Sequence, residues 1–268
     1  MMYSKEFNDL IALVDNGYIG HGNPNAKILF VGQEPAWNRN TQAEHYDEEI
    51  GNNCSDWKKI VTENIGYDSI DLTKSEYTSP LNPWPLQQFQ VRSGDKEKRT
   101  LKGEKGTART WYMYPKIINS IYGKSLGRNE VLTLHRLSFH TDMSDEAYKK
   151  HKEAGDLSKA SVVKRMKILS HPFFRQFPVV IAAVGHFPRD SYGDSYFKDV
   201  FNVDFVGNQA FEDLPWINVN IREDENPQIV IHCQQVTAHR IGQRYFDRIV
   251  EIVKEFVKKH DINIFVND

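Results

Sequence analysis

The chain has 268 residues, of which 40% are hydrophobic and 12% aromatic, enough for one large domain with its own core. Its formal net charge of −2 excludes a protein coated in basic surface but leaves room for a local basic groove. No run approaches the ~20 apolar residues of a membrane span, and the N-terminus lacks a signal-peptide core, so a cytoplasmic protein is expected. Two cysteines are too few for a four-cysteine zinc or iron–sulfur site, and we expect no metal, no cofactor and no disulfide.

Short apolar runs predict the strands of the fold. Four such runs cover residues 27–31, 131–139, 178–185 and 228–232, and a candidate edge strand covers residues 262–266. Apolar residues at helical spacing predict helices at residues 6–14, 54–65, 111–122, 161–170 and 241–259. Because the strands alternate with helices, we expect an α/β fold: three α/β/α layers around a mainly parallel four-stranded central sheet.

The stretch between the first two strands, residues 38–129, carries the fewest signals. Three prolines in SPLNPWPLQQF exclude regular structure at residues 79–89, and basic residues among glycines follow at 92–109. The basic run fits either a solvated loop or an arm that contacts a polyanion. We therefore expect a single domain over residues 1–268 with an insertion around residues 80–110.

Two strand ends carry residue types suited to acid–base chemistry. The first strand ends in Gly32-Gln33-Glu34-Pro35, and the fourth ends at His232. Because the carboxyl ends of parallel strands share one edge of an α/β sheet, Glu34 and His232 are expected to face the same bound ligand. The alternative is that the glycine and proline only shape a turn and Glu34 is a solvated charge. Ser144 or Asp142, after the second strand, is interpreted as a possible helix N-cap.

These motifs resemble those of the uracil-DNA glycosylase superfamily. Its common branch has Gly-Gln-Asp-Pro-Tyr after the first strand, and His-Pro-Ser-Pro-Leu-Ser followed by an arginine after the last. This chain has Gly-Gln-Glu-Pro-Ala at residues 32–36, His-Cys-Gln-Gln-Val-Thr at residues 232–237, and Arg240 at the matching offset. The similarity spans about residues 27–256. It implies a monomeric base-excision-repair enzyme that releases uracil or a modified pyrimidine from DNA, single- or double-stranded.

The resemblance also implies roles for individual residues. Glu34 would orient the water that attacks the sugar, and His232 would stabilise the negative charge of the departing base. The base would lie against Gln33, Ala36 and Trp37. The second strand of the family offers a base-reading residue, for which His135 is the candidate here, with His140 competing and a core role for the histidine as the alternative.

The loop after the fourth strand would contact DNA. Gln234, Val236, Thr237 and Arg240 are the residues implied, with Val236 as the apolar wedge that helps to extrude the base.

Several departures from the family pattern bear on the function. Glu34 is one methylene longer than the usual aspartate, and Ala36 replaces the tyrosine that excludes five-substituted pyrimidines, although Trp37 can refill that space. The prolines of the second motif are absent, and the stacking phenylalanine has only weak counterparts. Two other functions therefore stay open: a nucleic-acid or nucleotide-binding module with weak or lost catalysis, and a hydrolase of small nucleosides.

Overall fold

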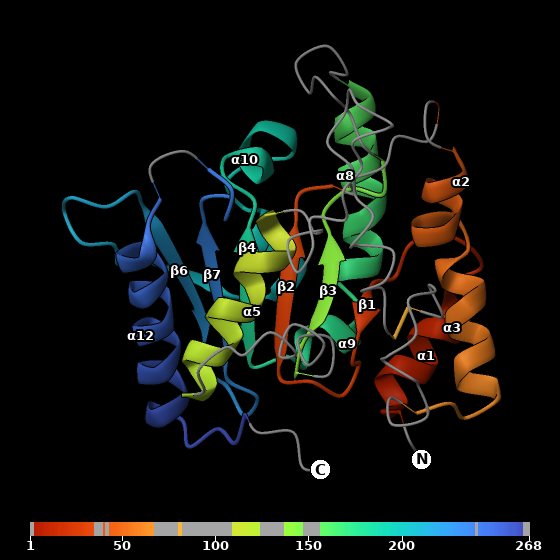
Figure 1. The fold of residues 1–268 in the computed structure, drawn as a ribbon, viewed down its shortest axis with the longest axis horizontal. Helices are drawn as coiled ribbons and strands as arrows, with labels where there is room; N and C mark the ends of the chain where they lie inside the picture. The colour runs from red at the N-terminus through yellow and green to blue at the C-terminus, as the bar shows by residue number, and fades with distance from the viewer. Residues whose placement is uncertain are drawn as a thin grey trace, which may run out of the picture.

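A computed structural model describes residues 3–34, 40, 43–66, 80–81, 109–123, 137–146, 156–238 and 241–264. These residues form an α/β fold around a mixed sheet of seven strands in the order β1-β3-β2-β4-β7-β6-β5 (Figure 1). The strands are β1 (His21–Gly22), β2 (Ile28–Gly32), β3 (Phe139–Asp142), β4 (Val179–Ala183), β5 (Asp204–Asn208), β6 (Ile217–Arg222) and β7 (Gln228–Cys233).

The prediction of a four-stranded, mainly parallel sheet is wrong. The four expected strands correspond to a central parallel block, β3-β2-β4-β7. At one side of this block β1 pairs antiparallel with β3. At the other side β6 pairs antiparallel with β7, and β5 pairs antiparallel with β6. β1 has only two residues, too few for a sequence pattern. β5 is exposed and contains a glycine, while the alternating INVNIR of β6 is a strand signal that the apolar-run criterion misses.

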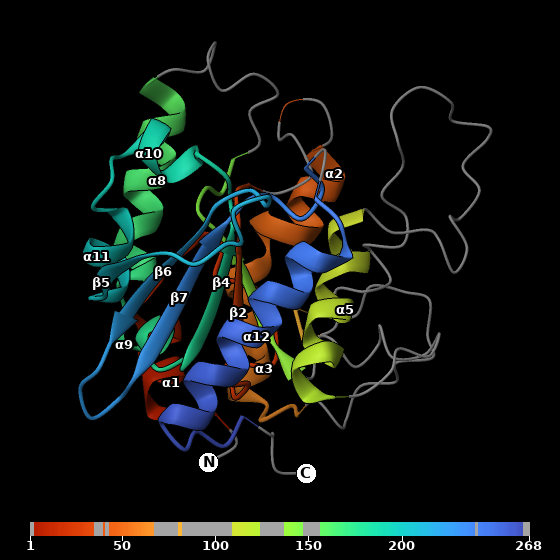
Figure 2. The ribbon, with the colours of Figure 1, turned by 90° about the vertical axis from the view of Figure 1, so that its left-hand side faces the viewer.

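Helices cover both faces of the sheet, so the three-layer arrangement is present (Figure 2). One face is covered by α1 (Lys5–Leu13), α3 (Asn53–Thr62), α8 (Asp156–Leu169), α9 (Pro172–Arg175), α10 (Phe187–Ser191) and α11 (Tyr196–Phe201). The other is covered by α5 (Arg109–Tyr122) and α12 (Gln243–Lys259). A short α2 (Ala43–Tyr46) continues into the π-helix η1 (Asp47–Gly51).

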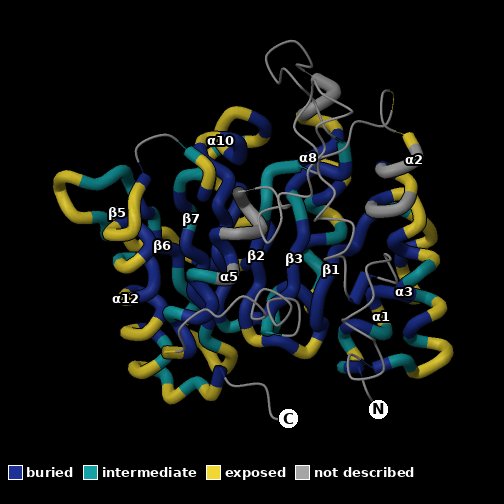
Figure 3. Tube along the Cα trace, viewed as in Figure 1, coloured by how far each residue is buried: buried dark blue, intermediate teal, exposed yellow. Residues whose placement is uncertain are grey.

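The core lies on both sides of the central strands, which are buried along their length (Figure 3). In β2, Leu29 and Val31 pack into the α1/α8/α11 side, whereas Ile28 and Phe30 pack into the α5/α12 side. Successive strand residues point to opposite faces, so a strand covered on both faces is apolar throughout. That is why continuous apolar runs predicted β2, β4 and β7 correctly.

The five expected helices correspond to α1, α3, α5, α8 and α12. The expected second strand is displaced: Leu137 is helical, β3 starts at Phe139, and residues 131–136 lie outside the described part of the chain. Residues 262–264 are not in a strand, and the last four residues are not described. Of the expected insertion around 80–110, only residues 80, 81, 109 and 110 are described.

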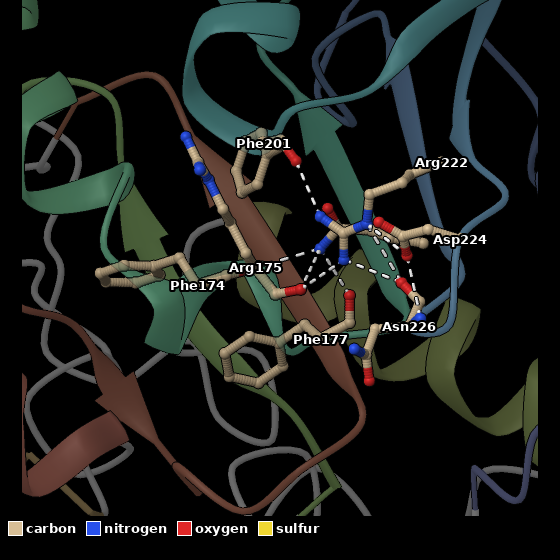
Figure 4. Close-up of polar contacts among 8 residues, drawn as sticks. Phe174, Arg175, Phe177, Phe201, Arg222, Asp224 and Asn226 are labelled. Atoms are coloured by element: carbon tan, nitrogen blue, oxygen red, sulfur yellow. Dashed lines mark hydrogen bonds and ion pairs between the residues drawn. The ribbon is translucent and has the colours of Figure 1, made fainter. Parts of the chain in front are cut away.

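Hydrogen bonds from side chains to backbone carbonyls fix the far end of β6 and β7 (Figure 4). The Arg222 guanidinium donates to the carbonyl oxygens of Phe201 at 3.1 Å and Arg175 at 2.9 Å, and to that of Asn226 in the β6–β7 turn at 2.8 Å. Gln228 Nε2 donates to the Phe177 carbonyl at 2.7 Å. These bonds tie the β6–β7 hairpin to α9 and α11.

Within the described ranges, no helix is both long and apolar enough to cross a membrane. The same residues contain no group of three or more His, Cys, Asp or Glu side chains that could hold a metal ion. Cys54 and Cys233 are both buried and unbridged.

Candidate functional site

The order of the parallel strands identifies one edge of the sheet. The chain passes from β2 to β3 on one side, and then returns to β4 on the other side of β2 before reaching β7. In an open α/β sheet, the carboxyl ends of the strands at such a reversal are where ligands bind. The ends of β2 and β4 are therefore the expected centre of a site, with β3 and β7 on either side.

The chain leaving β2 stays bound to the chain leaving β3. The Gly32 carbonyl accepts a hydrogen bond from the Met143 backbone N–H at 2.9 Å, and the Gln33 carbonyl accepts one from the Ser144 N–H at 3.1 Å. Glu34 follows directly and is partly buried. The two backbones thus hold Gln33 and Glu34 beside the end of β3.

Asp142 is the last residue of β3 and the register partner of Gly32. A Cβ atom added to Gly32 would overlap Asp142 Oδ1 and lie 3.3 Å from its Cγ, so glycine is what leaves space for this carboxyl group. Burial raises the pKa of Asp142 to about 7, with the nearby Arg165 charge acting in the opposite direction. The carboxyl group therefore keeps a large neutral fraction near pH 7.

A buried arginine positions the end of β3. Arg165 on α8 is fully buried, and its guanidinium donates to Thr141 Oγ1 at 2.8 Å, to the Asp142 carbonyl at 3.2 Å and to the Tyr18 carbonyl. Thr141 Oγ1 in turn donates to the Ile19 carbonyl at 2.8 Å. Because Arg165 binds backbone and hydroxyl oxygens, it orients Asp142 without forming a direct ion pair with its carboxylate.

The loop after β7 reaches the loop after β2. The Gln235 side-chain amide donates a hydrogen bond to Gln33 Oε1, which joins the two predicted motifs directly. The Gln234 backbone N–H donates to the Tyr245 hydroxyl at 3.0 Å, and that hydroxyl donates to the Trp216 carbonyl at 3.0 Å. Tyr245 of α12 thereby holds the start of the loop.

His232 lies at the end of β7, with Nε2 2.6 Å from the Gly185 carbonyl. Its ring packs between Phe197 and Trp216, with both ring centroids 4.7 Å away. Burial lowers the pKa of His232 to about 4, which the Gly185 hydrogen bond only partly offsets. The imidazole is thus neutral at pH 7, its Nε2–H donates to Gly185, and Nδ1 is left as an acceptor.

Among the other residues implied for DNA contact, Thr237 is exposed and Gln234 partly buried, whereas Val236 is 2% exposed within the α5/α12-side core. His140 is buried, stacks on Phe30 with centroids 5.2 Å apart, and has Nε2 2.8 Å from Ser138 Oγ, as a core histidine would. Ala36, Trp37, His135 and Arg240 lie outside the described residues.

The structure joins Gln33 directly to Gln235 and places Glu34, Asp142 and His232 at the carboxyl ends of the parallel strands β2, β3 and β7; we call these five residues the strand-end site. Sequence reasoning missed Asp142 and the contact role of Gln235. The signal for Asp142 was a carboxylate just after a strand, but the strand was placed too early in the chain. Carboxyl groups and a neutral imidazole are residue types that can perform acid–base chemistry on a bound ligand.

No protein-family model matches this sequence, and a search of curated proteins finds no relative. The chemistry of the strand-end site has to be argued from its own residues.

Proposed function

We propose that this chain is a divergent, monofunctional glycosylase of the uracil-DNA glycosylase type, which hydrolyses the N-glycosidic bond of uracil or a modified pyrimidine in DNA. The contact between Gln33 and Gln235 carries the proposal. It joins the two loops whose sequences resemble the family motifs, at the edge of the sheet where such a site belongs. Neither motif contains a lysine that could form a Schiff base with the sugar.

Breaking an N-glycosidic bond builds positive charge on the sugar and negative charge on the base. In the proposed mechanism Glu34 orients the attacking water and faces the positive sugar. Asp142 acts on the side of the leaving base, where a carboxyl group with a raised pKa donates a hydrogen bond to the developing anion. The two carboxyl groups then have different roles, one toward the attacking water and one toward the leaving base. Other glycosidic hydrolyses also use a pair of carboxyl groups, of which one is ionised and the other protonated.

His232 supports the same leaving base in this proposal. A neutral imidazole has one N–H, and here Nε2–H is bound to the Gly185 carbonyl. The Nε2–H of His232 therefore has to leave the Gly185 carbonyl and donate to the base as negative charge develops on the base. This exchange distinguishes His232 from a purely structural histidine, which would keep its bond to Gly185.

DNA is the proposed partner, bound by a cytoplasmic monomer through the loop after β7. Thr237 is already exposed there, but Val236 has to leave the core before it can act as a wedge between bases. Extruding a base costs roughly a few kcal/mol, and the released wedge would offset part of that cost.

The test is release of base from oligonucleotides that contain uracil, mismatched thymine or a five-substituted pyrimidine, single- and double-stranded. Glu34→Gln is expected to reduce the single-turnover rate by about 100-fold or more, since a positioned acid–base group contributes roughly that factor. Glu63→Gln, at the exposed end of α3, is the matched control and should match the wild-type rate. Equal release by wild type and Glu34→Gln would overturn the role of Glu34.

Other outcomes separate the alternatives. Salt-dependent DNA binding without base release from any substrate would favour the binding module. Release of base from free nucleosides but not from DNA would favour the nucleoside hydrolase. Either result would replace the glycosylase proposal.

A further inference from the structure

A cavity lies beside the strand-end site, on the α10/α11 side of β6 and β7. It encloses about 550 Å³ and is lined chiefly by His186, Arg189, Phe197, Trp216, Asn218 and His232. We call it the β6 pocket. None of Gln33, Glu34 or Asp142 lines it. Its size falls in the range of small-molecule pockets, roughly 300–1,000 Å³, and it is open to solvent on one side.

The floor of the β6 pocket follows from strand geometry. Asn218 and His232 are register partners in the antiparallel β6–β7 pair. Ile217 and Val219, the neighbours of Asn218, pack into the α5/α12 side, so the Asn218 side chain points to the opposite face. Directly opposed residues have Cβ atoms about 5 Å apart, which places the Asn218 amide next to the His232 ring.

The walls of the pocket are aromatic. Trp216 packs on the rings of His232 and His186, with centroids 4.7 and 5.2 Å away, and Phe197 of α11 covers His232 from the other side. Phe205 of β5 also lines the pocket and is 65% exposed. Ring walls of this kind suit a flat aromatic ligand, which can stack or pack edge-on against them.

Unused polar groups converge on the same space. The Asn218 amide, Trp216 Nε1 and His232 Nδ1 form no hydrogen bonds within the described part of the chain. The amide offers both a donor and an acceptor, the indole a donor and the imidazole an acceptor. At the rim, Arg189 and Asp194 carry opposite charges, so the lining has no net charge to attract an ion.

We propose that the β6 pocket binds a neutral, planar heteroaromatic molecule of nucleoside size, which has hydrogen-bond donors and acceptors on its ring. The aromatic walls of the pocket would stack on the faces of the ligand ring. The Asn218 amide, the Trp216 indole and the His232 imidazole would form hydrogen bonds with its polar edge. The inference goes beyond the proposed function, because it concerns a separate ligand site that shares only His232 with the strand-end site. It holds whether or not the chain releases bases from DNA.

The test is calorimetric titration of wild-type protein with uridine, with adenosine, and with methyl riboside as the sugar without a base. At least one nucleoside should bind saturably and methyl riboside should not. Asn218→Leu should weaken binding about fivefold or more, as expected for the loss of one or two hydrogen bonds. Phe205→Ala should weaken it about threefold or more. Val206→Ala, the matched control at an exposed neighbour on β5 outside the lining, should change it less than twofold.

Failure of both nucleosides to bind at millimolar concentration would overturn the inference, and so would equal affinity of Phe205→Ala and Val206→Ala. Phe205 and Val206 are both exposed, so this pair decides the question even if Asn218→Leu does not fold. Binding that is lost in Glu34→Gln but intact in Phe205→Ala would place the ligand at the strand-end site and also overturn the inference. The readout is binding rather than base release, so failure of the glycosylase proposal is seen separately.

Discussion

Gly32 and Asp142 are partners across two neighbouring parallel strands, and the missing side chain of one makes room for the carboxyl group of the other. The pairing also links the two halves of the strand-end site. Gly32 begins the motif that leads to Glu34, while Asp142 ends the strand on which no catalytic group was expected. A turn glycine in the sequence motif is thus also a packing requirement of the site.

Replacing Gly32 by alanine should therefore displace the Asp142 carboxyl group. We expect Gly32→Ala to lower the free energy of unfolding by about 1–3 kcal/mol, the usual cost of an inserted methyl group, and to reduce base release. Chemical denaturation and the release assay measure the two effects. Gly242→Ala is the control, because its φ is −122° and nothing lies within 4 Å of an added Cβ. Equal stability of the two variants would contradict the packing role.

The raised pKa of Asp142 predicts how stability changes with pH. The native carboxyl group binds a proton up to about pH 7 and the unfolded one only up to about 3.8, so stability falls as pH rises between these values. The loss is on the order of 3 kcal/mol. Asp142→Asn cannot titrate and should remove this slope. Denaturation at pH 4, 5.5 and 7 tests it, and a slope unchanged in the variant would rule out Asp142 as its source.

Asp142 should also determine how the rate of base release falls as the pH rises above 7. If its proton serves the leaving base, the wild-type rate should fall about tenfold per pH unit above pH 7. Asp142→Asn keeps an N–H donor, so its rate should be lower overall but flat in this range. Rates at pH 6 to 9 give the comparison. An alkaline limb that persists in Asp142→Asn would assign the titration to another group.

His232 predicts the opposite pH effect on stability. Its native pKa is about 4 and its ordinary value 6.5, so the unfolded chain binds the proton first and stability falls as pH drops from 6.5 to 4. His232→Gln should remove this acid destabilisation. His171→Gln is a useful comparison, because burial also lowers the pKa of His171, without a large shift. Equal acid sensitivity in wild type and His232→Gln would contradict a buried neutral imidazole.

Arg222 should be a major stabilising residue of the β6–β7 hairpin. Arg222→Ala leaves the Phe201, Arg175 and Asn226 carbonyls without their charged donor and should cost about 2–4 kcal/mol. Arg244→Ala removes only an exposed ion pair with Asp213 and should cost less than about 1 kcal/mol. Urea denaturation compares the two variants. Similar losses would show that the network contributes little.

Sequence patterns predicted the strands best where both faces of a strand are buried. Ile28 to Val31 and Val179 to Ala183 are apolar on both faces, and such runs identify strands without further information. β3 was misplaced because His140, Thr141 and Asp142 are polar, and they lie in a strand only because Phe30, Arg165 and Gly32 contact them there. Contacts between distant segments leave no local pattern in the chain.

The candidate site was predictable in part for the same reason. Gln33 and the loop after His232 could be brought together from the order of the strands, and the Gln33–Gln235 contact agrees with that expectation. The chemistry of the site was less accessible, since the pKa values of Asp142 and His232 depend on burial that only the folded chain creates. Neither the Gly185 contact of His232 nor the β6 pocket has a sequence signature.

The irregular pairing of β5 has a consequence for encounters between copies of this chain. β5 is the outermost strand on its side of the sheet, and its register with β6 shifts between Phe205 and Gly207. A regular edge would present evenly spaced amide and carbonyl groups to which a strand of another molecule could bind. The extra residue interrupts that spacing, so the bulge that accompanies the exposed Phe205 and Val206 also protects the sheet from growing by aggregation.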